Sequence, residues 1–83
     1  MYYTYLLESR LDESWYIGFS SDLKERLKRH NNGENISTKS KRPWIVIYYE
    51  AYLDRRDAEG RERFLKSGSR RKFLKKQLAH YLS

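Results

Sequence analysis

The chain has 83 residues and no cysteine, and its 18 lysine and arginine residues outnumber its 11 aspartate and glutamate residues, which gives a net charge of +7. This length predicts one domain with a small core, and the absence of cysteine excludes disulfide bonds and thiolate metal sites. The charge predicts a polyanionic partner, and the lack of a signal-peptide pattern or of an apolar run near ~20 residues predicts a cytosolic protein without a membrane span.

Two short segments near the N-terminus predict a β-hairpin, because both are rich in aromatic and apolar residues. Residues 2–8 read YYTYLLE and residues 14–20 read SWYIGFS. In the second segment two sets of side chains alternate: Trp15, Ile17 and Phe19 in one set, and Ser14, Tyr16, Gly18 and Ser20 in the other. Alternating residues face opposite sides of a sheet, so the first set is expected to face the core and the second an open face.

The length of the hairpin loop decides whether Tyr5 and Tyr16 share a face. A four-residue turn at residues 9–12 places Tyr5 directly opposite Tyr16, with both phenols on one side. A five-residue turn places Tyr5 opposite Ile17 and separates the two phenols, because a shift of one residue turns every side chain to the other face. We expect the first register, or a bulge with the same result.

A helix is predicted to begin at Asp22, where Glu25, three residues later, completes a capping box. Gly33 is expected to end it. Arg26 and His30 are four residues apart and therefore lie on one side of the helix. Its inward stripe consists of Leu23, Leu27 and His30.

The rest of the chain predicts one strand and two helices after a polar, basic loop at residues 33–42 (GENISTKSKR). Residues 44–52 (WIVIYYEAY) give the strongest strand pattern, a helix is predicted over residues 54–66, and another follows Ser69. The expected order is β-β-α-β-α-α. This is an α+β fold with a three-stranded, mainly antiparallel sheet flanked by helices, in a single domain over residues 1–83.

The positive charge lies mainly in the second half of the chain. Residues 42–83 hold eleven basic and five acidic residues, a net +6, whereas residues 1–41 hold seven and six, a net +1. A charged helix face is often simply solvated, but this bias favours a surface that contacts phosphates. The candidates for such contacts are Lys39, Lys41 and Arg42 in the loop, and Lys66, Arg70, Arg71, Lys72, Lys75 and Lys76 near the C-terminus.

Five features of the sequence together resemble the GIY-YIG nuclease family. They are the triplets Tyr3-Thr4-Tyr5 and Tyr16-Ile17-Gly18, then Arg26 and His30 on one helix, and Glu62 on another. The second triplet matches the family name in full, and in the first Tyr3-Thr4 stands where the name has Gly-Ile. The chain is most similar to the small standalone bacterial members and to the nuclease domain of excision-repair endonucleases. Residues 60–66 (GRERFLK) resemble the family's third motif, whose glutamate binds the metal.

The resemblance implies a role for each of these residues. Tyr5 is expected to act as general base or as its relay, Tyr16 and Arg26 to stabilise the phosphate, and His30 to position its neighbours. Glu62 is expected to be the only protein ligand of a Mg²⁺ or Mn²⁺ ion, which suits a hard cation completed by water and substrate phosphate. A phenol with a pKa near ~10 needs nearby positive charge to ionise, and Arg26 can supply it permanently.

The same residues also have structural interpretations. Arg26 could pair with Asp22 on the helix surface, and His30 could complete the apolar stripe of its helix. Glu62 could form an ordinary ion pair, for which three basic residues lie close on the helix: Arg61, Arg63 and Lys66.

The function implied by the resemblance is a divalent-metal-dependent endonuclease that hydrolyses phosphodiesters, with DNA favoured over RNA and selection for branched, nicked or damaged structures, as in DNA repair. One alternative is a nucleic-acid-binding module with little turnover, because no asparagine follows Asn35, where many members have one, and Phe19 stands where some nucleases have lysine. Another is an interaction domain in a repair or mobile-element complex, where a protein partner supplies specificity.

Overall fold

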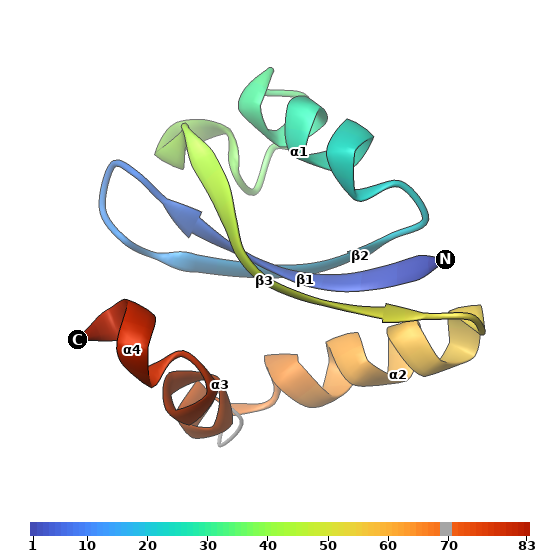
Figure 1. Cartoon of the computed structure of the whole chain (residues 1–83). Helices are drawn as coiled ribbons and strands as arrows, with labels where there is room; N and C mark the ends of the chain where they lie inside the picture. The colour runs from blue at the N-terminus through green and yellow to red at the C-terminus, as the bar shows by residue number, and fades with distance from the viewer. Residues whose placement is uncertain (69–70) are drawn as a thin grey trace.

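The computed structural model describes residues 1–68 and 71–83 (Figure 1). The predicted order of strands and helices is confirmed, and the fold is α+β. Its elements are β1 (Tyr2–Ser9), β2 (Trp15–Ser20), α1 (Leu23–Asn31), a short 3₁₀ helix η1 (Lys39–Lys41), β3 (Trp44–Tyr52), α2 (Arg55–Lys66), α3 (Arg71–Gln77) and α4 (Ala79–Leu82). The last predicted helix is in fact two, because Leu78 leaves helical backbone angles (φ −108°, ψ 24°) between α3 and α4. Ser69 and Arg70 lie outside the described residues.

The three strands form an antiparallel sheet in the order β2-β1-β3. The predicted register of the hairpin is wrong by two residues, since Tyr5 lies opposite Gly18 and not opposite Tyr16. The reason is that the strands extend further: the backbone N–H of Ser9 donates to the carbonyl of Ser14 at 2.8 Å, so the four-residue loop begins one residue later than expected. A shift of two residues preserves the face, and both tyrosines still point to one side.

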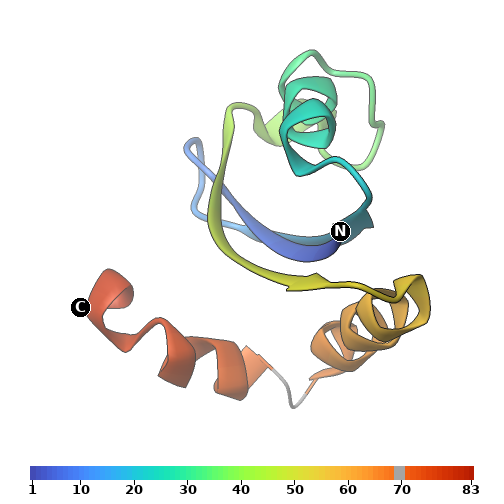
Figure 2. The ribbon, with the colours of Figure 1, turned by 45° about the vertical axis from the view of Figure 1, so that its right-hand side comes forward.

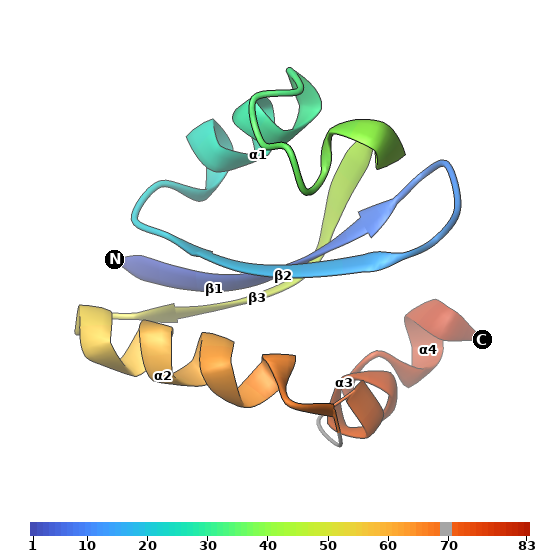
Figure 3. The same ribbon diagram turned by 180° about the vertical axis from the view of Figure 1, so that it is seen from behind.

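Helices cover both faces of the sheet, as Figures 1 and 3 show. The helix α1 lies over one face, and α2 with α3 lies over the other. The expectation of an open face beside Tyr16 is therefore wrong. Each face has its own buried cluster: Tyr5, Leu7 and Trp44 under α1, and Leu6, Leu65 and Leu74 under α2 and α3.

The end of α1 is fastened to the start of β3 by one side chain. Asn31 donates from Nδ2 to the carbonyl of Trp44 at 3.0 Å, and its Oδ1 accepts from the Trp44 N–H at 2.6 Å. Figure 2 shows α1 and the loop after it on one side of the sheet, with α2, α3 and α4 on the other. This pair of bonds holds His30, the residue before Asn31, against the sheet. Within the described ranges, each helix is too short or too polar to cross a membrane.

Candidate active site

A chain of hydrogen bonds joins Tyr5, His30 and Thr38 beneath α1. The hydroxyl of Tyr5 lies 3.0 Å from Nε2 of His30, and Nδ1 of His30 lies 2.8 Å from Oγ1 of Thr38. The exposed fractions are 1% for Tyr5 and 0% for both partners. Polar groups are rarely buried so completely unless they are hydrogen-bonded, and here every ring nitrogen and hydroxyl has a partner.

The network assigns the tautomer of His30. The Thr38 hydroxyl donates to the carbonyl of Asn35 at 3.3 Å, so its oxygen is free to accept a bond from Nδ1–H of His30. Nε2 then carries no proton and accepts from the hydroxyl of Tyr5. Burial lowers the pKa of His30, and the positive charge of Arg26 lowers it further. The imidazole is therefore neutral near pH 7 and able to accept a proton.

The phenol of Tyr5 is held in its protonated form. Burial raises its pKa well above the ordinary value, and the nearby phenol of Tyr16 adds to this effect. The charge of Arg26 and a hydrogen bond from its guanidinium act in the opposite direction, as expected, but burial outweighs them. Arg26 therefore lowers the pKa of Tyr5, but this effect is smaller than the increase that burial causes.

Gly18 provides the space that Tyr5 occupies. A Cβ atom at Gly18 would lie 2.6 Å from Cε2 of Tyr5 and would clash with its hydroxyl. The ring of Tyr5 therefore lies against the backbone of β2, where a larger residue cannot be accommodated without displacing the phenol. This contact is a physical reason for glycine at the third position of Tyr16-Ile17-Gly18.

Tyr16 and Arg26 border this buried chain. The ring of Tyr16 is half-buried, with its centroid 5.1 Å from that of His30 at an interplanar angle of 63°. Arg26 extends from α1, with Nη1 3.5 Å from the carbonyl of Phe19. The alternative ion pair between Arg26 and Asp22 does not occur in the described chain, where Asp22 instead caps α1 by accepting from the N–H of Glu25 at 3.1 Å.

Glu62 lies on α2, which covers the opposite face of the sheet from α1. Its carboxylate forms an ion pair with Lys66 at 3.1 Å, and the exposed fractions of the two side chains are 23% and 52%. Its negative charge also raises the pKa of Tyr5, which places it within electrostatic range of that phenol. The structure thus brings together Tyr5, Tyr16, Arg26 and His30 under α1, with Glu62 close by on α2.

The donors available for a metal ion are few. No group of three or more histidine, aspartate or glutamate side chains converges anywhere in residues 1–68 and 71–83. A single partly buried carboxylate at Glu62 does fit a Mg²⁺ or Mn²⁺ ion that keeps most of its water ligands and takes the rest from a phosphate. The ammonium of Lys66 now holds that carboxylate, so an ion there would have to displace it.

The basic candidates lie in two groups on opposite sides of the sheet. Near η1, Lys41 pairs with Asp12 at 3.4 Å, and Arg42 donates from Nε to the carbonyl of Lys39 at 2.8 Å. On α3, Leu74 is buried and Phe73 is partly buried, while the basic side chains are exposed. The exposed members of this second group are Lys66, Arg71, Lys72, Lys75 and Lys76, and the structure does not describe Arg70.

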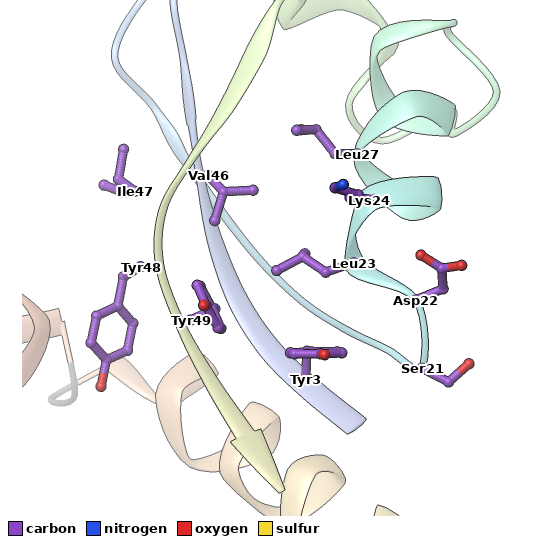
Figure 4. A pocket seen from close by; sticks show the side chains of 10 residues that line it. All are labelled: Tyr3, Ser21, Asp22, Leu23, Lys24, Leu27, Val46, Ile47, Tyr48 and Tyr49. Carbon is purple, nitrogen blue, oxygen red and sulfur yellow. The ribbon is translucent and has the colours of Figure 1, made fainter. Parts of the chain in front are cut away.

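A hollow of about 850 Å³ lies elsewhere on the α1 face, between α1 and the outer strand β3 (Figure 4). Leu23 and Leu27 point into it from α1 towards Val46, and Lys24 and Asp22 lie at its edge. None of the five predicted catalytic residues lines it. We place the candidate site at Tyr5 and Tyr16, because Tyr5 and His30 form a buried hydrogen bond there and neither lines this groove.

Two residues of the site were not predicted from the sequence. Thr38 fixes the tautomer of His30 from eight positions away, and Asn31 holds α1 against β3. Neither contributes to a helix or strand periodicity. The sequence contains one indication of a role for Asn31, which is that this polar residue directly follows the inward stripe of α1.

Comparisons with known proteins show the family and the fold of this chain. Residues 1–77 match the model of the GIY-YIG catalytic domain. A UPF0213 protein of Clostridium perfringens is 36% identical over 75 residues, which cover 89% of this chain and 80% of the relative. A UPF0213 protein of Staphylococcus saprophyticus is also 36% identical, over 89% of this chain and 90% of its own length. The solution structure of a UPF0213 protein from Bacillus halodurans superposes with a TM-score of 0.55 at 34% identity, over 98% of this chain and 85% of that one.

Proposed function

We propose that this chain, which belongs to the GIY-YIG family, is a nuclease domain that hydrolyses nucleic-acid phosphodiesters at the site formed by Tyr5, Tyr16, Arg26 and His30. The observation that carries the proposal is the buried bond between the Tyr5 hydroxyl and Nε2 of His30, placed beside a guanidinium and a half-buried phenol. A packed core alone does not require a buried phenol–imidazole pair, since polar groups are costly to bury.

The pair can remove a proton from water without forming a free phenolate. As the oxygen of Tyr5 takes the proton of the attacking water, the hydroxyl of Tyr5 passes its own proton to Nε2 of His30. The neutral imidazole accepts it, and the phenol stays neutral throughout, which its raised pKa requires. This extends the expected part of His30 from positioning to accepting the proton.

Arg26 and Tyr16 supply the electrostatic part of the reaction. A fixed guanidinium and a phenol hydroxyl near the phosphate stabilise the negative charge that builds on its oxygens. Glu62 would hold a divalent cation, Mg²⁺ or Mn²⁺, whose charge neutralises the phosphate when it is bound. Exposed basic residues on α3 and near η1 would contact the backbone on either side.

This proposal includes DNA as the preferred substrate, selection by the structure of the nucleic acid, and a cytosolic location. Selection by shape is favoured over selection by sequence, because the contacts proposed for the exposed basic residues are to phosphates, which carry no direct sequence information. A protein partner that supplies further specificity is compatible with the same surfaces.

The second candidate function, a binding module with little turnover, is favoured by one observation. The carboxylate of Glu62, which would hold the metal ion, forms an ion pair with Lys66 instead. One assay separates the two functions: cleavage of supercoiled plasmid and of duplex, single-stranded, flap and junction substrates, with Mg²⁺ or with EDTA. Cleavage that requires Mg²⁺ supports the nuclease, and binding without cleavage on every substrate supports the binding module.

A further inference from the structure

A smaller hollow lies on the α2 side of β2, where α2 ends and α3 begins. Its volume is about 320 Å³, within the range of roughly 300–1,000 Å³ of pockets that hold small organic ligands. Trp15 of β2 and the buried Leu65 and Leu74 contribute apolar surface, whereas Lys66 and Arg71 contribute exposed cations. The hollow therefore combines an aromatic ring with positive charge.

The indole of Trp15 is fixed in place. Its Nε1 donates to Oε2 of Glu8 at 3.1 Å, and the other oxygen of that carboxylate accepts from the Tyr81 hydroxyl at 2.6 Å. The guanidinium of Arg71 lies over the indole, 5.3 Å from the ring centroid. The ring is held by its edge, and the exposed guanidinium would have to lift off the ring to admit a flat ligand beneath it.

The charge of the hollow favours an anionic ligand. The described residues that line it include Lys66 and Arg71 and no carboxylate. Only the outer strand β2 separates it from the candidate active site, since its lining includes Tyr16, whose ring packs on the α1 face, and Nζ of Lys66 lies 3.1 Å from the carboxylate of Glu62. A strand with its phosphate at Tyr16 and Arg26 could therefore place a neighbouring nucleotide here.

We propose that this hollow binds one unpaired nucleobase of the nucleic-acid strand held at the candidate active site. The base stacks on Trp15 with the guanidinium of Arg71 over its other face, and Lys66 holds the adjoining phosphate. Base stacking on an aromatic ring tolerates any sequence, because every base has a flat π-face, and arginine adds to it. A base inside a duplex is already stacked on both sides and cannot enter. This inference rests on the proposed function, because the base belongs to the strand that the candidate active site holds.

The test compares two strands that carry the same charge in EDTA without metal. One is a twelve-nucleotide oligothymidylate, and the other is a strand of the same length made of abasic sugars. We expect the wild-type chain to bind oligothymidylate roughly 5- to 100-fold more tightly, the size of one stacked base. Tryptophan fluorescence should be quenched by oligothymidylate only, since Trp44 is 3% exposed whereas the partly buried Trp15 lines the hollow.

Two variants and a control assign the effect to the hollow. Trp15→Leu should bring the affinity for oligothymidylate down to that for the abasic strand, without changing the salt dependence of binding. Arg71→Gln changes an exposed residue, so folding is not at risk, and it should lower the ratio of the two affinities. Arg63→Gln removes the same charge from an exposed arginine of α2 that does not line the hollow, and should leave that ratio unchanged.

Equal affinity of the wild-type chain for the two strands would overturn the proposal. So would an unchanged ratio in both Trp15→Leu and Arg71→Gln. These results are independent of catalysis, because no metal is present. A chain that prefers the base-bearing strand but cuts nothing keeps the base pocket and loses the nuclease function, whereas a chain that cuts plasmid without that preference loses the base pocket alone.

Discussion

The two faces of the sheet bury side chains of different chemistry. Under α1, the fully buried Tyr5 and His30 are joined by a hydrogen bond, with Thr38 beyond them. Under α2 and α3, the buried cluster is centred on leucines such as Leu6 and Leu74. Burying polar groups adds little stability even when every bond is made, whereas burying leucine is strongly stabilising. The comparison predicts that the α2 face contributes more to the stability of the fold than the buried polar pair of the α1 face does.

Truncation of the apolar cluster should give the largest effect on stability. Leu6 is 0% exposed at the centre of the sheet, so Leu6→Ala should lower the free energy of unfolding by about 2–5 kcal/mol. Leu53 is 86% exposed, and Leu53→Ala should stay within about 0.5 kcal/mol of wild type. Urea unfolding measures both. A loss below about 1 kcal/mol for Leu6→Ala would mean that the α2 face does not carry the stability.

Removal of the charge at Glu62 should affect catalysis far more than folding. Glu62→Gln keeps the shape of the side chain, and its ion pair with Lys66 is a partly exposed helix pair worth about 0.3–0.5 kcal/mol. Cleavage should nevertheless fall by at least ~100-fold, the scale of a principal electrostatic group, while nucleic-acid binding is kept or strengthened.

The chain contains a matched control for this change. Glu59 forms the same kind of pair with Arg55, at 2.9 Å, on the same helix. Glu59→Gln should cleave like wild type, and thermal unfolding of both variants checks that they remain folded. Equal cleavage by the two variants would return Glu62 to its structural interpretation, and the metal site would lie elsewhere.

The buried imidazole should make stability depend on pH above the range where carboxylates titrate. Because the pKa of His30 is lowered in the folded state, the unfolded chain binds the proton more readily. The stabilisation is complete above the unfolded pKa of about 6.5 and is lost as pH falls below it, by at most about 1.4 kcal/mol per pH unit. Unfolding should be followed from pH 7.5 to 5.5. His30→Gln should flatten the profile, and the exposed His80→Gln should leave its slope unchanged; equal slopes in all three proteins would contradict the neutral imidazole.

The salt dependence of binding should show which side of the sheet meets the backbone. Each duplex phosphate neutralised by a cation steepens the slope of log affinity against log salt by ~0.9. If α3 contacts the backbone, Lys72→Ala with Lys75→Ala should flatten that slope, and Lys39→Ala with Lys41→Ala should do the same for η1. If a double substitution leaves the slope unchanged, its two lysines lie on a solvated surface that does not contact the backbone.

Much of the fold follows from local patterns in the sequence. The strand at residues 44–52 was predicted with its observed bounds, and Asp22 caps α1 as expected, because alternation and capping are properties of neighbouring residues. The register of the hairpin was wrong because the bond between Ser9 and Ser14 depends on how the loop closes. The break at Leu78 likewise has no glycine or proline to mark it.

The family could be predicted from the sequence, but the surroundings of the candidate site residues could not. The order of Tyr5, Tyr16, Arg26 and Glu62 in the sequence indicated the family, which the match over residues 1–77 confirms. The burial of Tyr5 was not foreseen, because residues 14–20 alternate in a way that indicates one open face. The packing of α1 on that face buries the phenol of Tyr5. This burial raises the pKa of the phenol more than the charge of Arg26 lowers it.

The most direct test of the account is the cleavage rate of Tyr5→Phe, which removes one hydroxyl and keeps the ring that packs on Gly18. With Mg²⁺ and the best substrate of the panel, we predict a loss of at least ~100-fold, the usual contribution of a general base. The variant leaves Nε2 of the buried His30 without its partner, so the free energy of unfolding should fall by about 1–3 kcal/mol, and cleavage is measured well below the melting temperature of the variant. Tyr49→Phe removes a hydroxyl from an exposed tyrosine and should cleave normally. Undiminished cleavage by Tyr5→Phe, or a wild-type chain that cleaves no substrate with Mg²⁺, would contradict the assignment of the α1 face as a nuclease site.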